Sequence, residues 1–273
     1  MTRTALGLVF TLACTLGALW ILVRLLEPRA AFFPSRGEQV TPAAMGVAFD
    51  ALDVRTGDGE TLRAWRLRHA RPLAEVVYFH GNGGNLALWS PVFVELHRRG
   101  YGVFAFDYRG YGASTGSPSE RGLYRDVDAV LEVVARQPAP PGVPLVYWGR
   151  SLGAAMAAYG ASRHAPGGVV LEAGFPDTRT LLAGNPVLSV LSHFSSYRFP
   201  TAAWMATVTS PTLVLHGTAD SVIPYPMGER LYAGLRGPKR FHAIVGGDHN
   251  DPEPRDAETY WRVVQEFVGG LSG

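Results

Sequence analysis

The sequence contains very little cysteine, very little lysine and almost no net charge. Cys14 is the single cysteine among 273 residues, so neither an intramolecular disulfide nor a cysteine-based zinc site can form. Lys239 is the only lysine, and the other 24 of the 25 basic residues are arginines, a bias that we attribute to codon usage. A net charge of +2 without long basic runs argues against nucleic acid as a partner.

Low-complexity tracts and internal repeats are also missing, as are the glycine patterns of the common phosphate-binding loops. The composition, 47% hydrophobic and 18% charged, is that of a globular protein. The length suits one large domain with a well-buried core, with room for a short extra segment.

The first 30 residues differ from the rest of the chain. Residues 4–23 carry no charge, and about 20 apolar residues are enough to cross a bilayer as a helix. A cleavable signal peptide is the main alternative, but the apolar run continues into Arg24 without a clean cleavage site. We therefore expect residues 1–30 to be a single-pass membrane anchor. Arg3 before the run and Arg29 after it leave the orientation undecided.

Residues 31–273 are expected to form one domain in which short apolar runs alternate with amphipathic segments. Residues 50–55 and 61–69 predict an antiparallel hairpin around a glycine-containing turn. Further strands are expected at residues 75–80, 102–106, 144–148, 168–171, 212–216 and 241–245. Helices are expected at residues 86–99, 119–136, 152–162, 225–235 and 257–268. This alternation predicts an α/β fold with a mostly parallel, twisted sheet and helices on both faces.

One stretch, residues 175–207, breaks the alternation. It is rich in Leu, Val and aromatic residues and contains few charges. A short lid over an active site has such a composition, and so has an ordinary helix packed on the sheet. Both interpretations stay open at this stage.

The strongest local motif is Gly149-Arg150-Ser151-Leu152-Gly153, a G-x-S-x-G. It follows an apolar strand and opens a helix of small residues, which is the context that presents a nucleophilic serine on a sharp strand-to-helix turn. The flanking glycines allow neighbouring elements to approach closely. A glycine-rich turn without catalysis is the alternative, and the flanking strand and helix argue against it.

A nucleophilic serine also needs donors for the oxyanion that forms on the substrate. The glycine-rich loop at residues 80–85 follows the strand at 75–79, and such a loop supplies one backbone N–H while the residue after the nucleophile supplies the other. We therefore predict Asn82 and Leu152 as the oxyanion-hole donors. Phosphate binding by this loop is a weaker alternative, because no phosphate-loop pattern is present.

A serine hydroxyl needs a base, and the base needs an acid to orient it. The expected chain order is serine, acid, histidine. Asp220 follows the strand at 212–216 and His249 follows the strand at 241–245, so both side chains are expected at the carboxyl edge of the sheet. His216 has a structural place at a strand end. Rival acids are Asp248, which is expected to orient the base loop, and also Asp251 and Glu172.

The loop at residues 107–114 is rich in glycine and aromatic residues and could bind substrate. A structural role is preferred, because Asp107 and Arg109 can tie loops together near the nucleophile.

Five sequence blocks together resemble the α/β-hydrolase superfamily and, within it, the membrane-anchored bud-emergence-type branch. The resemblance covers residues 75–268, and its blocks are His80–Asn85, Asp107–Asp126, Gly149–Gly153, His216–Pro224 and Gly246–Asp251. It implies the α/β-hydrolase fold and hydrolysis of acyl esters, on lipid, thioester or small-ester substrates.

The sequence thus predicts a membrane-bound serine hydrolase with Ser151, Asp220 and His249 as its catalytic triad. The anchor and the apolar stretch suggest an ester or thioester of an apolar acyl chain, and no metal or organic cofactor is expected. Two alternatives remain. One is a peptidase of the prolyl-oligopeptidase type, and the other is an inactive fold that serves as a membrane-bound scaffold.

Overall fold

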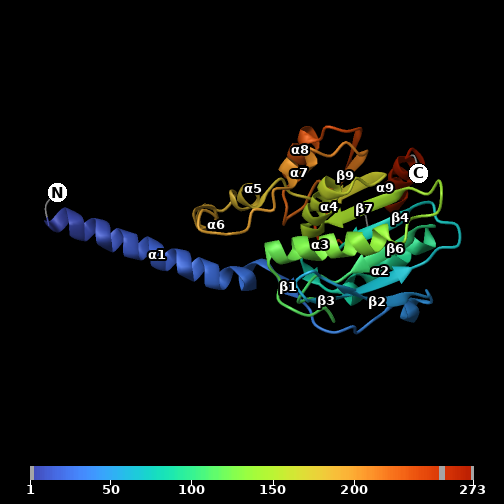
Figure 1. Ribbon diagram of the computed structural model, residues 1–273. Helices are drawn as coiled ribbons and strands as arrows, with labels where there is room; N and C mark the ends of the chain where they lie inside the picture. The colour runs from blue at the N-terminus through green and yellow to red at the C-terminus, as the bar shows by residue number, and fades with distance from the viewer. Residues whose placement is uncertain (1–2, 252–255, 272–273) are drawn as a thin grey trace.

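The computed structural model describes residues 3–251 and 256–271 (Figure 1). Within these residues, an eight-stranded sheet has the order β10-β9-β8-β7-β4-β6-β3-β2. Its strands are β2 (Asp50–Arg55), β3 (Thr61–Leu67), β4 (Glu75–Phe79), β6 (Gly102–Phe106), β7 (Leu145–Arg150), β8 (Gly168–Glu172), β9 (Thr212–Gly217) and β10 (Lys239–Ile244). Only β2 and β3 run antiparallel to their neighbours, and the other strands pair in parallel. The predicted mostly parallel sheet and its antiparallel hairpin are confirmed.

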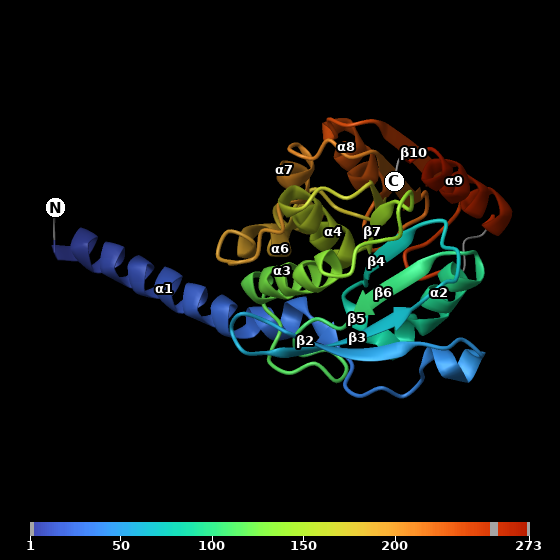
Figure 2. The same cartoon turned by 45° about the vertical axis from the view of Figure 1, so that its right-hand side comes forward.

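Helices cover both faces of this sheet (Figures 1 and 2). The bounds of the five long ones are α2 (Leu86–Arg98), α3 (Glu120–Ala135), α4 (Leu152–Arg163), α8 (Tyr225–Gly234) and α9 (Ala257–Gly269). Side chains of α3, α4 and α8 belong to one hydrophobic core, and those of α2 and α9 belong to the other. β6 is buried at every residue because both faces are covered, which explains its unbroken apolar sequence, and β8 is equally buried and is apolar up to its last residue, Glu172.

The stretch at residues 175–207 contains three short helices, α5 (Thr178–Leu182), α6 (Pro186–Leu191) and α7 (Thr201–Met205). α7 packs on α4, and its Met205 is buried. α5 and α6 project from the body of the domain instead, and Val187 and Val190 on α6 are more than 60% exposed. The interpretation as a packed helix therefore holds for α7, and the interpretation of α5 and α6 as a lid stays a prediction.

The chain begins with a long helix, α1 (Arg3–Ala31), which extends away from the domain in both views (Figures 1 and 2). An 18-residue window in α1 has a mean hydropathy of 2.3, and none of that window is buried in the protein. By length and composition, α1 can cross a membrane. α5 and α6 lie on the side of the domain from which α1 leaves.

The connector after α1 contains one short strand and one helical turn. β1 (Phe33–Pro34) pairs in parallel with β5 (Gly83–Gly84), and a 3₁₀ turn follows at Pro42–Met45. Sequence periodicity did not predict β1 or β5, because two-residue strands are too short to show a period.

Candidate active site

Ser151 occupies the turn between β7 and α4 with φ 57° and ψ −120°. A positive φ is uncommon for a residue with a side chain and costs on the order of 1–3 kcal/mol, so the surrounding structure must hold it. The glycines of the motif make that turn possible. A Cβ on Gly149 would lie 2.0 Å from the carbonyl oxygen of Gly153, and one on Gly153 would lie 1.8 Å from that of Phe79. The motif therefore has the strained turn that the sequence context predicts.

The three side chains predicted as a triad meet at the carboxyl edge of the sheet. His249 Nδ1 lies 2.8 Å from Asp220 Oδ2, and His249 Nε2 lies 3.1 Å from Ser151 Oγ. An ionised carboxylate can only accept, so Nδ1 carries the ring proton and Nε2 is left to accept from the serine hydroxyl. This arrangement allows a proton to pass from Ser151 to His249.

Asp220 is buried, yet its environment favours the charged form. Burial works against ionisation, but the hydrogen bond from His249 and the backbone amides of Ile223 and Val222 outweigh it. The pKa of Asp220 therefore lies below its usual value. A carboxylate that stays ionised can both orient a histidine and stabilise its protonated form.

The loop that carries His249 is fixed by two groups. Asp248 Oδ1 accepts hydrogen bonds from the backbone amides of Ser221 and His249, both at 2.8 Å. This fits the prediction that Asp248 orients the loop. Arg150 donates from Nη2 to the carbonyl oxygen of His249 at 2.7 Å, and its guanidinium lies over the ring of Trp89. Sequence reasoning missed Arg150 because the x position of G-x-S-x-G has no fixed residue type.

The two predicted oxyanion donors flank the nucleophile from different elements. Leu152 is the first residue of α4, so its N–H has no carbonyl partner within the helix. Asn82 lies after β4, and the tight packing of Gly153 against the carbonyl oxygen of Phe79 brings that strand end against the nucleophile turn. The side chain of Asn82 is held by Ala31 and Tyr111, two contacts that the sequence did not predict.

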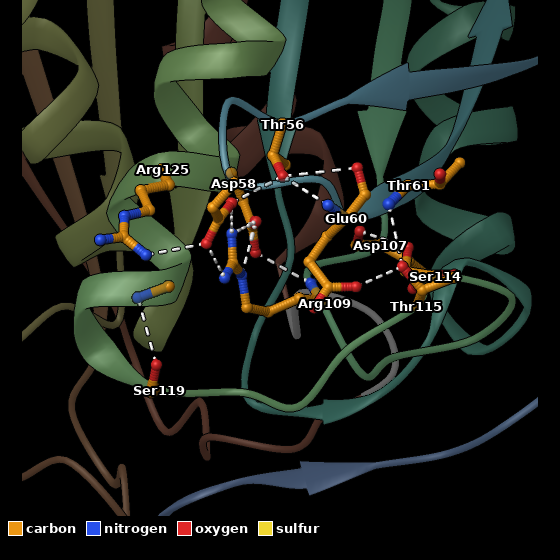
Figure 3. Close-up of polar contacts among 12 residues, drawn as sticks. Thr56, Asp58, Glu60, Thr61, Asp107, Arg109, Ser114, Thr115, Ser119 and Arg125 are labelled. Atoms are coloured by element: carbon orange, nitrogen blue, oxygen red, sulfur yellow. Dashed lines mark hydrogen bonds and ion pairs between the residues drawn. The ribbon is translucent and has the colours of Figure 1, made fainter.

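The loop at residues 107–116 is fastened to the hairpin (Figure 3). Ser114 Oγ accepts from the backbone of Arg63 and donates to the carbonyl oxygen of Asp107, while Thr115 Oγ1 accepts from the amide of Thr61. Asp107 Oδ1 accepts from the amide of Leu86 at 2.8 Å, which ties β6 to the first turn of α2. The preferred structural role of this loop agrees with these contacts.

Arg109 forms the centre of a second charged group, the Arg109 cluster, which also contains Asp58, Asp126 and Arg125 (Figure 3). Its guanidinium makes two hydrogen bonds to Asp58, at 2.8 and 3.0 Å, and one to Asp126 at 2.8 Å. These bonds join the hairpin turn, the loop after β6 and α3, and the contact between Arg109 and Asp126 is buried, whereas Asp58 is exposed.

The rival residues have other partners. Glu172 Oε2 accepts from Trp148 Nε1 and from the hydroxyl of Tyr260, both at 3.1 Å. His216 is fully buried, its Nε2 lies 2.8 Å from the carbonyl oxygen of Ile223, and burial lowers its pKa. Both residues support the site from within the sheet rather than face the nucleophile.

A cavity of about 350 Å³ adjoins the triad, and its lining includes Tyr78, Trp148, His216, Asp220, His249 and Tyr260. Asp220 and His249 contribute to this lining, whereas Ser151 does not. In the described part of the chain, no cluster of three or more His, Cys, Asp or Glu side chains could hold a metal ion.

Comparison with protein families gives one match, which covers about half of the chain. The family model described as serine aminopeptidase, S33, matches residues 70–206, which span β4, the nucleophile turn and the projecting helices. The chain belongs to this family of α/β hydrolases.

This hydrolase also has curated relatives along most of its length. It is 30% identical over 278 residues to protein bem46 of Schizosaccharomyces pombe, covering 94% of this chain and 90% of that protein. It is 31% identical to an uncharacterized membrane protein of Saccharomyces cerevisiae, covering 86% and 84% of the two chains. A Mycobacterium tuberculosis protein is 32% identical, covering 89% and 87%. The resemblance to the bud-emergence-type branch is thereby confirmed.

Solved structures confirm the fold of the hydrolase. An esterase of Pyrococcus furiosus superimposes with a TM-score of 0.70 at 19% identity, covering 89% of this chain and 98% of that one. An esterase of Rhodococcus gives a TM-score of 0.61 at 19% identity, covering 81% and 99%. At such low identity, the agreement establishes the α/β-hydrolase fold.

Proposed function

We propose that this hydrolase cleaves carboxylic esters or thioesters through an acyl-enzyme on Ser151. The observation that carries the proposal is the series of contacts from Ser151 Oγ to His249 Nε2, 3.1 Å, and from His249 Nδ1 to Asp220 Oδ2, 2.8 Å. Nucleophile, base and orienting acid at such distances are the arrangement that acyl transfer by a serine requires.

In the first half of the reaction, Ser151 Oγ attacks the acyl carbon while His249 Nε2 takes the hydroxyl proton. The carbonyl oxygen becomes an oxyanion, which accepts hydrogen bonds from the backbone N–H groups of Asn82 and Leu152. The imidazolium of His249, stabilised by Asp220, then gives its proton to the leaving alcohol or thiol. The acyl group stays on Ser151 as an ester.

In the second half, water replaces the leaving group. His249 Nε2 takes a proton from the water, whose oxygen attacks the acyl carbon and forms a second oxyanion in the same place. When this intermediate collapses, the proton returns from His249 to Ser151 Oγ and the carboxylic acid departs.

The proposed substrate class rests on the apolar surfaces of α6 and α1. Exposed Val187 and Val190 on α6 lie on the side of the domain from which α1 leaves, and α1 is apolar enough to span a bilayer. Residues 1–30 then act as a membrane anchor, residues 31–273 as the hydrolase domain, and the projecting part of residues 175–207 as a lid. Two structural neighbours are esterases and one sequence relative is a membrane protein, which supports this proposal. Apolar acyl chains are therefore the proposed substrates.

A peptidase is the second candidate, because the name of the family refers to an aminopeptidase. An aminopeptidase needs a carboxylate for the substrate's amino terminus. Two acidic side chains near the triad are already engaged, Glu172 with Trp148 and Tyr260, and Asp248 with two backbone amides. Ester hydrolysis remains the preferred function.

The experiment combines a fluorophosphonate probe with a substrate panel. The full-length protein should be labelled by the probe, and Ser151→Ala should abolish labelling. Nitrophenyl esters and thioesters with 2 to about 16 acyl carbons should be hydrolysed, with kcat/KM rising from acetyl to longer chains, since each buried CH₂ contributes about 0.8 kcal/mol. Faster cleavage of aminoacyl nitroanilides would favour the peptidase. An unlabelled wild type would favour the inactive scaffold.

A further inference from the structure

The connector that follows α1 runs between two loops near the nucleophile. On one edge, β1 pairs with β5, and the Ser35 amide donates to the carbonyl oxygen of Gly84 at 2.9 Å. On the other edge, the Gly112 amide donates to Ser35 and the Gly37 amide donates to Gly112, at 2.8 and 3.0 Å. The connector therefore completes a small ladder between the loop that carries Asn82 and the loop after β6.

Asn82 has its side chain fastened at both ends. Its Nδ2 donates to the carbonyl oxygen of Ala31 at 2.7 Å. The hydroxyl of Tyr111 lies within hydrogen-bonding distance of both Asn82 Oδ1, 2.9 Å, and the Asn82 carbonyl oxygen, 3.0 Å. These contacts hold the Asn82 side chain and the peptide group between Asn82 and Gly83, which adjoins the peptide group whose N–H is the proposed oxyanion donor. The end of α1 is thus one of the two supports of that donor.

Glu27, one turn earlier on α1, is bound to the other segment beside the site. Its carboxylate accepts from the amides of Ser196 and Tyr197 at 3.0 to 3.3 Å, from the hydroxyl of Ser196 at 2.6 Å, and from Ser195. These donors follow α6 (Pro186–Leu191) by only a few residues. The carboxylate therefore fixes the base of the projecting part of the 175–207 segment.

Between these two attachments, Phe32 is packed as part of the core. It is 4% exposed, and its ring meets those of Tyr197 and Phe199 edge-on, with centroids 5.3 and 6.4 Å apart. Phe32 thus prevents the connector from swinging away from the domain. A flexible tether would need none of these contacts.

We propose that residues 27–37 are a positioning element of the active site. They set the oxyanion loop through Asn82 and the base of the projecting helices through Glu27. The inference rests on the proposed function and extends it, because it makes the end of the membrane helix part of the catalytic geometry. Oxyanion donors must lie within a few tenths of an ångström of their place, so support for Asn82 acts on the transition state.

The first test is Asn82→Ala in the full-length protein in detergent, which keeps the backbone N–H and removes only the side-chain supports. We expect kcat on an acetyl ester to fall by on the order of 10- to 100-fold, with KM changed less than about twofold. The fluorophosphonate labelling rate should fall in parallel, and the thermal midpoint should stay close to that of wild type. A purely structural role would lower the thermal midpoint and leave kcat of the folded protein intact.

The matched control is Glu38→Gln, on the same connector. Glu38 contacts Trp65 and Arg63 on β3 rather than the oxyanion loop. The kcat of Glu38→Gln should therefore equal that of wild type. If Asn82→Ala does not fold, Tyr111→Phe takes its place as the test variant. This substitution removes the hydroxyl that supports Asn82 and keeps the buried ring. Lower kcat at an unchanged thermal midpoint supports the inference, and unchanged kcat overturns it.

The second test is Glu27→Gln, the same chemical change as the control. A glutamine places an N–H₂ group against the donors of Ser196, so the attachment breaks. We expect KM for a dodecanoyl ester to rise by on the order of 3- to 10-fold, and by more than KM for an acetyl ester. Equal KM values for wild type and variant overturn this half of the inference. An unlabelled wild type would instead reject the proposed function.

Discussion

The predicted triad and the Arg109 cluster are both small networks of charged side chains, but their hydrogen bonding differs. Ser151, His249 and Asp220 form a single line of contacts that ends at a hydroxyl on a strained turn. In the Arg109 cluster, by contrast, one guanidinium bonds to two carboxylates that also accept from other donors.

From this difference we infer that the triad serves reactivity and that the Arg109 cluster serves stability. In the triad, a proton can move from Ser151 to His249. The strained backbone at Ser151 lowers the stability of the folded protein. The Arg109 cluster holds a fixed arrangement of charges, and removal of its central cation leaves the buried carboxylate of Asp126 without a cationic partner. Substitutions in the first network should therefore change rate, and substitutions in the second should change stability.

The largest effect is expected from Ser151→Ala or His249→Ala. Each should reduce kcat by on the order of 10⁶-fold, as in a well-studied serine protease, because the three groups act as one unit. The free energy of unfolding should stay within about 1 kcal/mol of wild type, since a small polar contact is lost at a strained turn. Steady-state kinetics and urea unfolding measure the two quantities. A large loss of stability would contradict the comparison.

The second largest effect is expected from Asp220→Asn. An asparagine amide can donate to His249 Nδ1 and so favours the wrong ring tautomer, which should lower kcat by about 10⁴-fold. The control is Asp248→Asn, which keeps an oxygen for the two amides and should retain most of the activity. If Asp220→Asn left kcat almost intact, the choice of acid would be wrong and Glu172 would be the next candidate.

The third change, Arg109→Met, acts on stability. It leaves Asp126 buried without its cation and should lower the free energy of unfolding by about 3–5 kcal/mol. Arg125→Met is the matched control, because the side chain of Arg125 is 55% exposed and should contribute less than about 1 kcal/mol. Urea unfolding gives both values. If both variants lost the same free energy of unfolding, burial would not explain the contributions of these two arginines.

The sequence predicts the regions with two-sided burial well. β6 was expected at residues 102–106 and lies there, because a strand covered on both faces must be apolar throughout. The meeting of Ser151, Asp220 and His249 could also be anticipated, since each follows a strand at the same edge of a parallel sheet. Their catalytic roles remain a proposal.

The contacts of the connector could not be predicted in the same way. Glu27 and the amide donor Ser196 are 169 positions apart, and neither segment has a period that signals the other. β1 and β5 have two residues each, so their pairing depends on the assembled domain rather than on local pattern. Such contacts arise only after the core has fixed the loops in space.

The smallest effect is expected at Asp58, the outer carboxylate of the Arg109 cluster. It is tested through the pH dependence of the free energy of unfolding. Hydrogen bonds from Arg109, Thr56 and Arg125 hold the pKa of Asp58 well below its ordinary value of about 3.9 (Figure 3). A pKa lowered by folding contributes stability that is present above about pH 4 and is lost as the pH falls through the folded-state value. The free energy of unfolding of wild type should exceed that of Asp58→Asn by about 1 kcal/mol at pH 7. This difference should shrink steadily below pH 4 in urea unfolding. A difference that stayed constant with pH would mean that Asp58 contributes through its shape rather than its charge.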